Sequence, residues 1–179
     1  EYLHTNDARP LQQVFYHNEM DVISLAALLN HISALIDDPL NGEIQHNDDL
    51  FAIGKLYADM GASERAMHIL RQGLRRNQPR GKAYWKGVKQ LSFLHKKQAN
   101  WSAAMELWEQ AAHNRQTYAH IELAKVYEHR RGDFAEAARW TQAAIELVTT
   151  PTMPRQKRIR WLPELQHRLK RLERRMEAK

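Results

Sequence analysis

The chain has 179 residues and a formal net charge of +6, from 27 Lys and Arg against 21 Asp and Glu. It contains no cysteine, which excludes disulfides and cysteine-based zinc sites and suits a cytoplasmic protein. No uninterrupted apolar run approaches the roughly 20 residues that cross a bilayer, and no signal-peptide pattern is present, so we expect no membrane attachment. Glycine and proline are scarce and strand-like alternation is rare, which predicts an all-α protein.

The charge is unevenly distributed along the chain. Residues 1–50 hold one basic and nine acidic residues, a net charge of −8. Residues 51–154 hold sixteen and nine, and residues 155–179 hold ten and three, so each of these parts carries +7. A basic body of this kind is able to contact nucleic-acid phosphates, although a solvated helical surface rich in Arg and Lys has the same composition.

The first predicted element is a helix that follows a polar start. Residues 1–14 are expected to form a loop, because Pro10 should interrupt an early helix. Apolar residues then recur at helical spacing, which predicts an amphipathic helix ending near residues 35–36, before the turn-forming residues 37–42. These apolar residues are Val22, Leu25, Ala26, Leu29, Ile32 and Ile36.

His17 and Asp21 stand four residues apart at the head of this helix. If the helix begins before His17, the two side chains share one face, where a carboxylate can bind a divalent metal and an imidazole can act on a metal-bound water. The alternative is structural. Asn18, followed three residues later by Asp21, is typical of a helix cap in which both side chains accept hydrogen bonds from backbone N–H groups.

The motif Tyr16-His17-Asn18-x-x-Asp21-Val22-x-Ser24-Leu25 resembles the last motif of the DEDD 3′–5′ exonucleases of the ribonuclease H-like superfamily. It is most similar to the YprB-type branch, in which a tetratricopeptide-like region follows the nuclease domain. The resemblance implies that Asp21 is a ligand of a catalytic metal, Mg²⁺ or Mn²⁺, and that His17 positions the attacking water. The other acidic motifs of the family would precede Glu1. A single carboxylate cannot hold a two-metal site, so this fragment is expected to be inactive and to need no cofactor of its own.

From residue 48 the chain shows internal repetition. Tetratricopeptide repeats of about 34 residues place large, small and aromatic residues on a first helix and small residues on a second. Three such pairs are expected, with a turn at residues 77–81 after the first pair, but their spacing is irregular and one extra residue precedes Gly132. The predicted organisation begins with the end of a truncated exonuclease domain at residues 1–36 and a linker at residues 37–47. A tetratricopeptide-like array (an α-α superhelix) follows at residues 48–148, and a basic capping helix at residues 149–179.

Three positional patterns support this organisation. In the first repeat the pattern falls on Leu50, Ile53, Gly54, Tyr57, Ala66, Leu70 and Gly73. In the second it falls on Tyr84, Val88, Leu91, Ser92, His95, Ala104, Trp108 and Ala111. In the third it falls on Leu123, Ala124, Tyr127, Ala137, Thr141 and Ala144, and here the phrase from Leu123 to Ala137 again resembles the YprB-type pattern.

The last helix is expected to begin near Leu162, because Pro163 is acceptable only in a first turn. Its apolar seam consists of Leu162, Leu165, Leu169, Leu172 and Met176, and its basic residues lie largely outside that seam. A terminal capping role is the direct interpretation, since the seam is too short to favour a coiled coil. We therefore expect a monomer.

Lysines and aromatic residues are the candidates for binding. Four lysines are the predicted nucleic-acid contacts: Lys86, Lys89, Lys96 and Lys97. Of the five tryptophans, we expect most to be buried, with Trp85 the most exposed and able to stack on bases. The ten histidines show no zinc-motif spacing, so a surface or packing role is expected for them.

Two functions are consistent with these patterns. The chain is either the non-catalytic repeat region of a metal-dependent 3′–5′ exonuclease, serving as a scaffold for nucleic acid or a protein, or a free-standing adaptor that binds a protein or peptide. Upstream acidic motifs would favour the first, and a start codon close to Glu1 the second.

Overall fold

The computed structural model of the chain describes residues 9–76 and 81–178, with side chains from residue 11 onward. The predicted turn at residues 77–81 lies outside these residues except for Gly81, as do residues 1–8 of the expected N-terminal loop and Lys179 of the expected capping helix. The helices are α2 (Arg9–Asp37), α3 (Asn47–Asp59), α4 (Ser63–Arg76), α5 (Lys82–Lys97), α6 (Trp101–His113), α7 (Thr117–Val126), the π-helical turn η1 (Tyr127–Arg131), α8 (Phe134–Thr149) and α9 (Arg155–Glu177).

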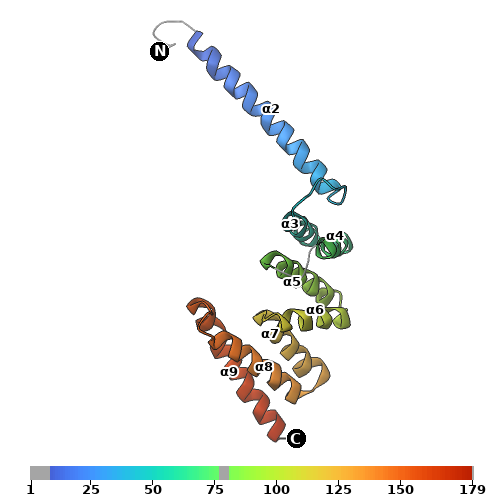
Figure 1. The fold of residues 1–179 in the computed structure, drawn as a ribbon, viewed down its shortest axis with the longest axis vertical. Helices are drawn as coiled ribbons and strands as arrows, with labels where there is room; N and C mark the ends of the chain where they lie inside the picture. The colour runs from blue at the N-terminus through green and yellow to red at the C-terminus, as the bar shows by residue number, and fades with distance from the viewer. Residues whose placement is uncertain (1–8, 77–80, 179) are drawn as a thin grey trace.

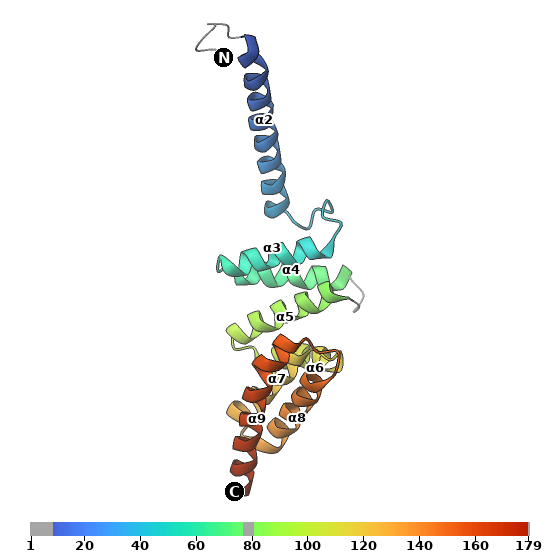
Figure 2. The ribbon, with the colours of Figure 1, turned by 90° about the vertical axis from the view of Figure 1, so that its left-hand side faces the viewer.

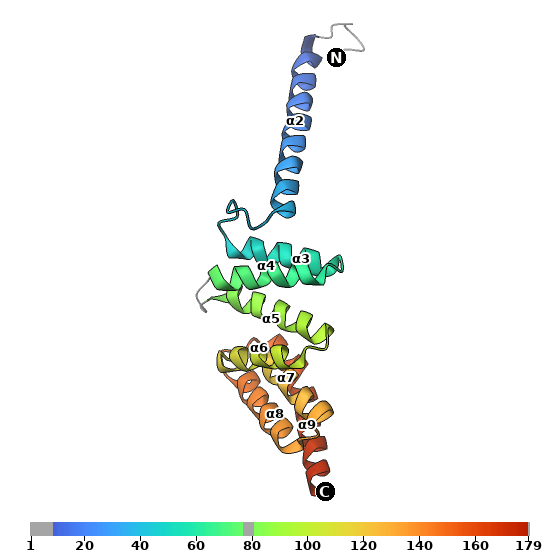
Figure 3. The same cartoon turned by 90° about the vertical axis from the view of Figure 1, so that its right-hand side faces the viewer.

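The described residues form helices and no strand, which confirms the all-α prediction. From α3 to α9, each helix packs on the one that follows it in sequence, so the molecule is elongated (Figure 1). Its buried apolar residues form successive clusters along the stack. Helix α2 extends away from this stack and contacts it at its last turn (Figure 2, Figure 3).

Helix α2 corrects two predictions. It begins at Arg9, so the expected loop over residues 1–14 is wrong for residues 9–14. Pro10 falls in the first turn, where the missing N–H would have had no helical partner, and so does not interrupt the helix. Because Asn18 and Asp21 lie well inside α2, they cannot cap its N-terminus, and the capping interpretation is also wrong.

The base of α2 is attached to the first helix pair. The Tyr57 hydroxyl donates a hydrogen bond to the carbonyl of Ile36 at 2.8 Å, and Arg65 donates one to the carbonyl of Asp37. Leu35 and Ile36 pack against the core of α3 and α4. The attachment therefore involves only the last turn of a 29-residue helix.

Phe51 joins the first helix pair to the second. Its side chain is fully buried, and its ring lies against two glycines, Gly73 of α4 and Gly87 of α5. A Cβ atom added at Gly73 would lie 2.8 Å from the Phe51 ring, and one added at Gly87 would lie 2.6 Å from it. Both distances are far below a normal carbon contact, so the two glycines permit the close approach of these helices.

We expect Gly87→Ala to lower the free energy of unfolding by about 1–2 kcal/mol. Alanine improves helix propensity by up to about 1 kcal/mol, but the added methyl overpacks the buried Phe51 ring at a cost of about 1–3 kcal/mol. In a Phe51→Leu background the clash is relieved, and the same change should be neutral or stabilising. Urea unfolding followed by circular dichroism of the four proteins measures this coupling, and an equal effect in both backgrounds would contradict the contact.

The extra residue before Gly132 is accommodated by η1. This π-helical turn ends at Gly132, whose φ of 66° is left-handed, a conformation that favours glycine. The Asp133 side chain then accepts a hydrogen bond from the Glu136 N–H at 3.0 Å and caps α8. The π turn places Glu128 in the interior, where it is 3% exposed.

Helix α9 begins at Arg155, seven residues before the predicted start. Pro163 lies inside it, on the exposed side of the helix. An interior proline costs about 3 kcal/mol, and the packing of Leu162 and Leu165 against α8 on both sides of Pro163 offsets this cost. The basic residues of α9 are not all on its outer face, because Arg168 and Arg171 both bind the buried carboxylate of Glu128.

Candidate nucleic-acid interface

His17 and Asp21 lie one turn apart in the N-terminal half of α2, and both side chains are exposed. The helix therefore does place the imidazole and the carboxylate on one face, as their spacing allows. Within residues 9–76 and 81–178, no three His, Asp or Glu side chains converge in a way that could hold a metal ion. The described residues alone do not form a metal site, and further ligands would have to come from outside them.

Apolar side chains are exposed almost all round α2. Leu25, Leu29 and Ile32 lie on one side at 64, 67 and 43% exposure, while Tyr16 and Ile23 lie on the other at 59 and 53%. Helices that are apolar all round are normally buried in a larger core or in a membrane. Among the described residues, α2 is also the one helix long and apolar enough to span a bilayer, which the sequence analysis did not expect. A buried core helix has the same length and composition, and Glu19 and Asp21 would be costly inside lipid.

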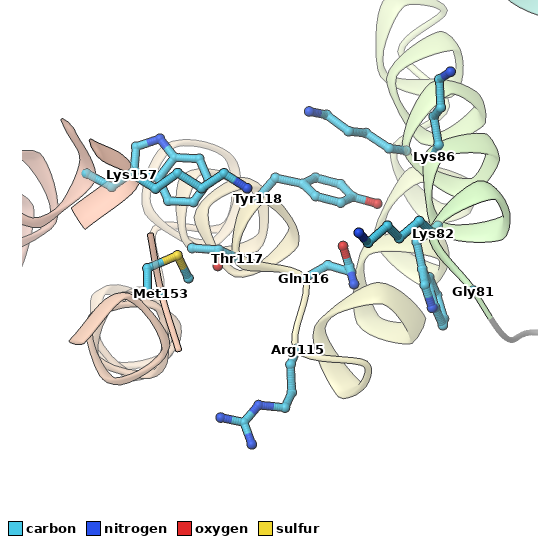
Figure 4. A pocket seen from close by; sticks show the side chains of 12 residues that line it. Gly81, Lys82, Lys86, Arg115, Gln116, Thr117, Tyr118, Met153 and Lys157 are labelled. Carbon is cyan, nitrogen blue, oxygen red and sulfur yellow. The ribbon is translucent and has the colours of Figure 1, made fainter. Parts of the chain in front are cut away.

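A hollow lies between α5, the start of α7 and the start of α9, and we call it the basic groove (Figure 4). Its volume is about 620 Å³. The lining residues are Gly81, Lys82, Trp85, Lys86, Lys89, Arg115, Gln116, Thr117, Tyr118, Met153, Lys157 and Trp161. None of these lining residues carries a carboxylate, so the groove is an electropositive surface.

Four lysines supply this charge. Lys82, Lys86 and Lys89 follow each other at helical spacing on one face of α5, and Lys157 extends from α9 on the opposite flank (Figure 4). Within the described part of the chain, none of the four forms an ion pair. The Arg115 side chain extends away from the groove in this view. The hollow on the other side of Trp85 has a different character, because it is lined by Glu106 and Glu109.

The aromatic residues of the groove are supported from behind. Trp85 and Tyr118 pack against the core around Trp108 and Leu123, and Trp161 packs against the core of α8 and α9. The Lys89 ammonium lies over the Tyr118 ring, 5.1 Å from its centre. Burial raises the pKa of the Tyr118 hydroxyl, so it remains a hydrogen-bond donor at neutral pH. This hydroxyl has no partner among the described residues.

The structure brings together two of the four predicted lysines and separates the others. Lys86 and Lys89 line the basic groove. Lys96 pairs with the buried carboxylate of Glu122 at 2.5 Å, which also binds Lys125 at 2.7 Å. Burial alone would raise the pKa of Glu122, but the hydrogen bonds and charges of these two lysines outweigh it and lower that pKa. Lys97 lies in a separate shallow hollow beside Lys55 and Asp59.

Sequence reasoning missed several groove residues. Lys82 could have been found, because it precedes Lys86 by four residues on the same face of α5. Lys157 and Trp161 could not, since the predicted start of α9 placed both in a loop. The prediction that most tryptophans are buried holds fully only for Trp108, and the other four, including Trp85, are half-buried.

Two histidines are packed into the core, as a structural role predicts. His95 and His120 are 6 and 7% exposed. Burial is the main cause that lowers the pKa of both, helped at His95 by the charge of Arg71. The His120 ring is also 5.5 Å from the Trp140 ring, in an edge-on contact. Both side chains are therefore neutral components of the interior at neutral pH.

Over its described residues, the chain is a stack of helices that presents an electropositive, aromatic-lined groove. No protein-family model matches the chain. The chain is 30% identical, over 132 residues, to the uncharacterized protein YprB of Bacillus subtilis (strain 168). The match covers 71% of this chain and 31% of YprB, so the chain spans less than a third of the length of this relative. The identity establishes a relationship to YprB.

Proposed function

We propose that this chain is the non-catalytic, tetratricopeptide-like helical region of a metal-dependent 3′–5′ exonuclease, and that it binds nucleic acid through the basic groove. The observation that carries the binding function is the concentration of four lysines in one aromatic-lined hollow that no carboxylate lines. None of the four forms an ion pair with a described residue. Phosphate contacts by lysine are the main source of affinity in protein–nucleic acid complexes.

The nuclease part of the proposal rests on the motif around His17 and Asp21 and on the relationship to the longer protein YprB. In the intact enzyme, Asp21 would supply one oxygen ligand to Mg²⁺ or Mn²⁺ and His17 would orient a water. Upstream carboxylates would complete the site. The exposed apolar surface of α2 supports this arrangement, because a domain that covered it would bury about ten large side chains that now face solvent.

The tetratricopeptide-like architecture rests on packing at the repeat positions. Small residues at Gly54, Ala66 and Gly73 lie where α3 and α4 approach closely, and Ala104, Ala137 and Ala144 are fully buried in the later pairs. A stack of this kind presents a continuous surface along its length, onto which a strand can be guided. The competing function is a free-standing adaptor, which would require a protein or peptide in place of the strand.

We expect the triple variant Lys82→Ala, Lys86→Ala and Lys157→Ala to weaken nucleic-acid binding by roughly 10- to 100-fold. The slope of log affinity against log salt should fall by about one for each lysine removed, because fewer counterions are released. Fluorescence anisotropy with a labelled oligonucleotide, titrated at several salt concentrations, gives both quantities.

The matched control removes three charges elsewhere: Lys97→Ala, Lys170→Ala and Arg174→Ala. All three residues are exposed, and none lines the basic groove. The control should bind within about threefold of the unmodified chain, because distant exposed charges are screened by salt. An equal loss of affinity in both triple variants would show that binding depends on overall charge. The basic groove would then not be the binding site. No binding by the unmodified chain would favour the adaptor.

A further inference from the structure

The basic groove combines charge with ring surfaces that are already held in place. Trp85 and Trp161 come from α5 and α9, on opposite flanks, and each is half-buried against a different part of the core. A ring fixed on one side and open on the other loses little conformational freedom when a base stacks on it. Such supported rings between lysines are the components of a single-strand site, where stacking accepts any base.

Tyr118 adds a polar group inside the same hollow. Its hydroxyl points across the groove toward α5 (Figure 4), and it has no hydrogen-bond partner among the described residues. The hydroxyl oxygen is itself buried, so Tyr118 lines the groove while this oxygen is closed to a ligand in the structure. The lysines on both flanks place positive charge around this position. The groove therefore offers a phosphate positive charge on both flanks.

We propose that the basic groove binds single-stranded nucleic acid, with its bases on Trp85 and Trp161 and its phosphates on the flanking lysines. The inference rests on the proposed function and specifies the form of the strand. In a duplex the bases are stacked on each other and only phosphates and groove edges are accessible, so the two rings would have no partner. The volume of about 620 Å³ is in the range of small-ligand pockets and accommodates a short stretch of strand, not a whole helix.

The test compares single-stranded DNA, single-stranded RNA and duplex DNA of the same sequence, each labelled and titrated with the chain. We expect both single strands to bind more tightly than the duplex. Trp85→Leu and Trp161→Leu should each weaken single-strand binding by roughly 5- to 100-fold and leave duplex binding unchanged. Trp85→Phe should restore most of the affinity, because phenylalanine keeps a stacking surface.

Trp101→Leu is the matched control, since Trp101 is also half-buried but lies outside the groove. It should bind like the unmodified chain, and circular dichroism checks that every variant is folded. Equal affinity for single strand and duplex, with both ring variants unchanged, would overturn this inference and leave the groove as a phosphate surface. Failure of all three nucleic acids to bind would also remove the proposed nucleic-acid binding by the groove. A preference for DNA or for RNA would identify the strand.

Discussion

Glu128→Gln is expected to lower the free energy of unfolding by about 2–4 kcal/mol and to release α9 from the stack. The Glu128 carboxylate is almost completely buried and binds Arg168 at 2.5 Å and Arg171 at 2.6 Å, with Arg175 at 3.8 Å. Removal of one member of a buried ion pair costs about 3–5 kcal/mol, because its partners are left uncompensated. The expected loss is smaller here, since the three arginines are 17–49% exposed and water screens them in part.

Hydrogen exchange is the most direct measurement of this effect. Amides of α9 should exchange faster in Glu128→Gln, while those of α3 and α4, at the other end of the stack, should keep their protection. Asp59→Asn is the matched control, because Asp59 also pairs with a basic residue, Lys55, but both side chains are more than half exposed. It should cost less than about 1 kcal/mol. Equal effects of the two substitutions would show that burial of Glu128 adds nothing to its ion pairs.

If the full-length protein is the proposed nuclease, Asp21→Ala is expected to reduce its rate by more than about 100-fold. The proposal makes Asp21 a direct metal ligand, and loss of even a supporting group near a catalytic metal costs 10- to 100-fold. Manganese-dependent release of nucleotides from the 3′ end of a labelled single strand, assayed in the full-length protein, measures this rate. The effect on folding should be small, since Asp21 is exposed and forms no ion pair among the described residues.

Glu19→Ala is the control for this experiment. Glu19 is also exposed on α2, two residues away and on a different face. It should retain nearly full activity. If Asp21→Ala retained full activity too, or if the full-length protein released no nucleotides, Asp21 would not be a metal ligand. The exonuclease proposal would then fail, whereas nucleic-acid binding by the basic groove would still be decided by its own binding test.

Local patterns predicted the helices of the stack well. Periodic apolar residues and small residues such as Ala66 and Ala104 identified helices that the structure contains, and these positions are indeed fully buried. Local rules failed where one residue was given too much weight. Pro10 and Pro163 both predict helix boundaries, yet Pro10 lies in a first turn and Pro163 is tolerated because its helix packs along α8.

The sequence by itself determined the all-helical class and the residues that share a face within one helix, such as Lys86 and Lys89 on α5 or His17 and Asp21 on α2. Tertiary structure alone decided which faces meet. It directed Lys96 to Glu122, buried Glu128 beneath the arginines of α9, and brought Lys157 and Trp161 to the groove of α5. The reason is physical, because helical periodicity is a property of neighbouring residues. These arrangements instead bring together side chains 26 to 79 positions apart, and their placement depends on the packing of the helices between them.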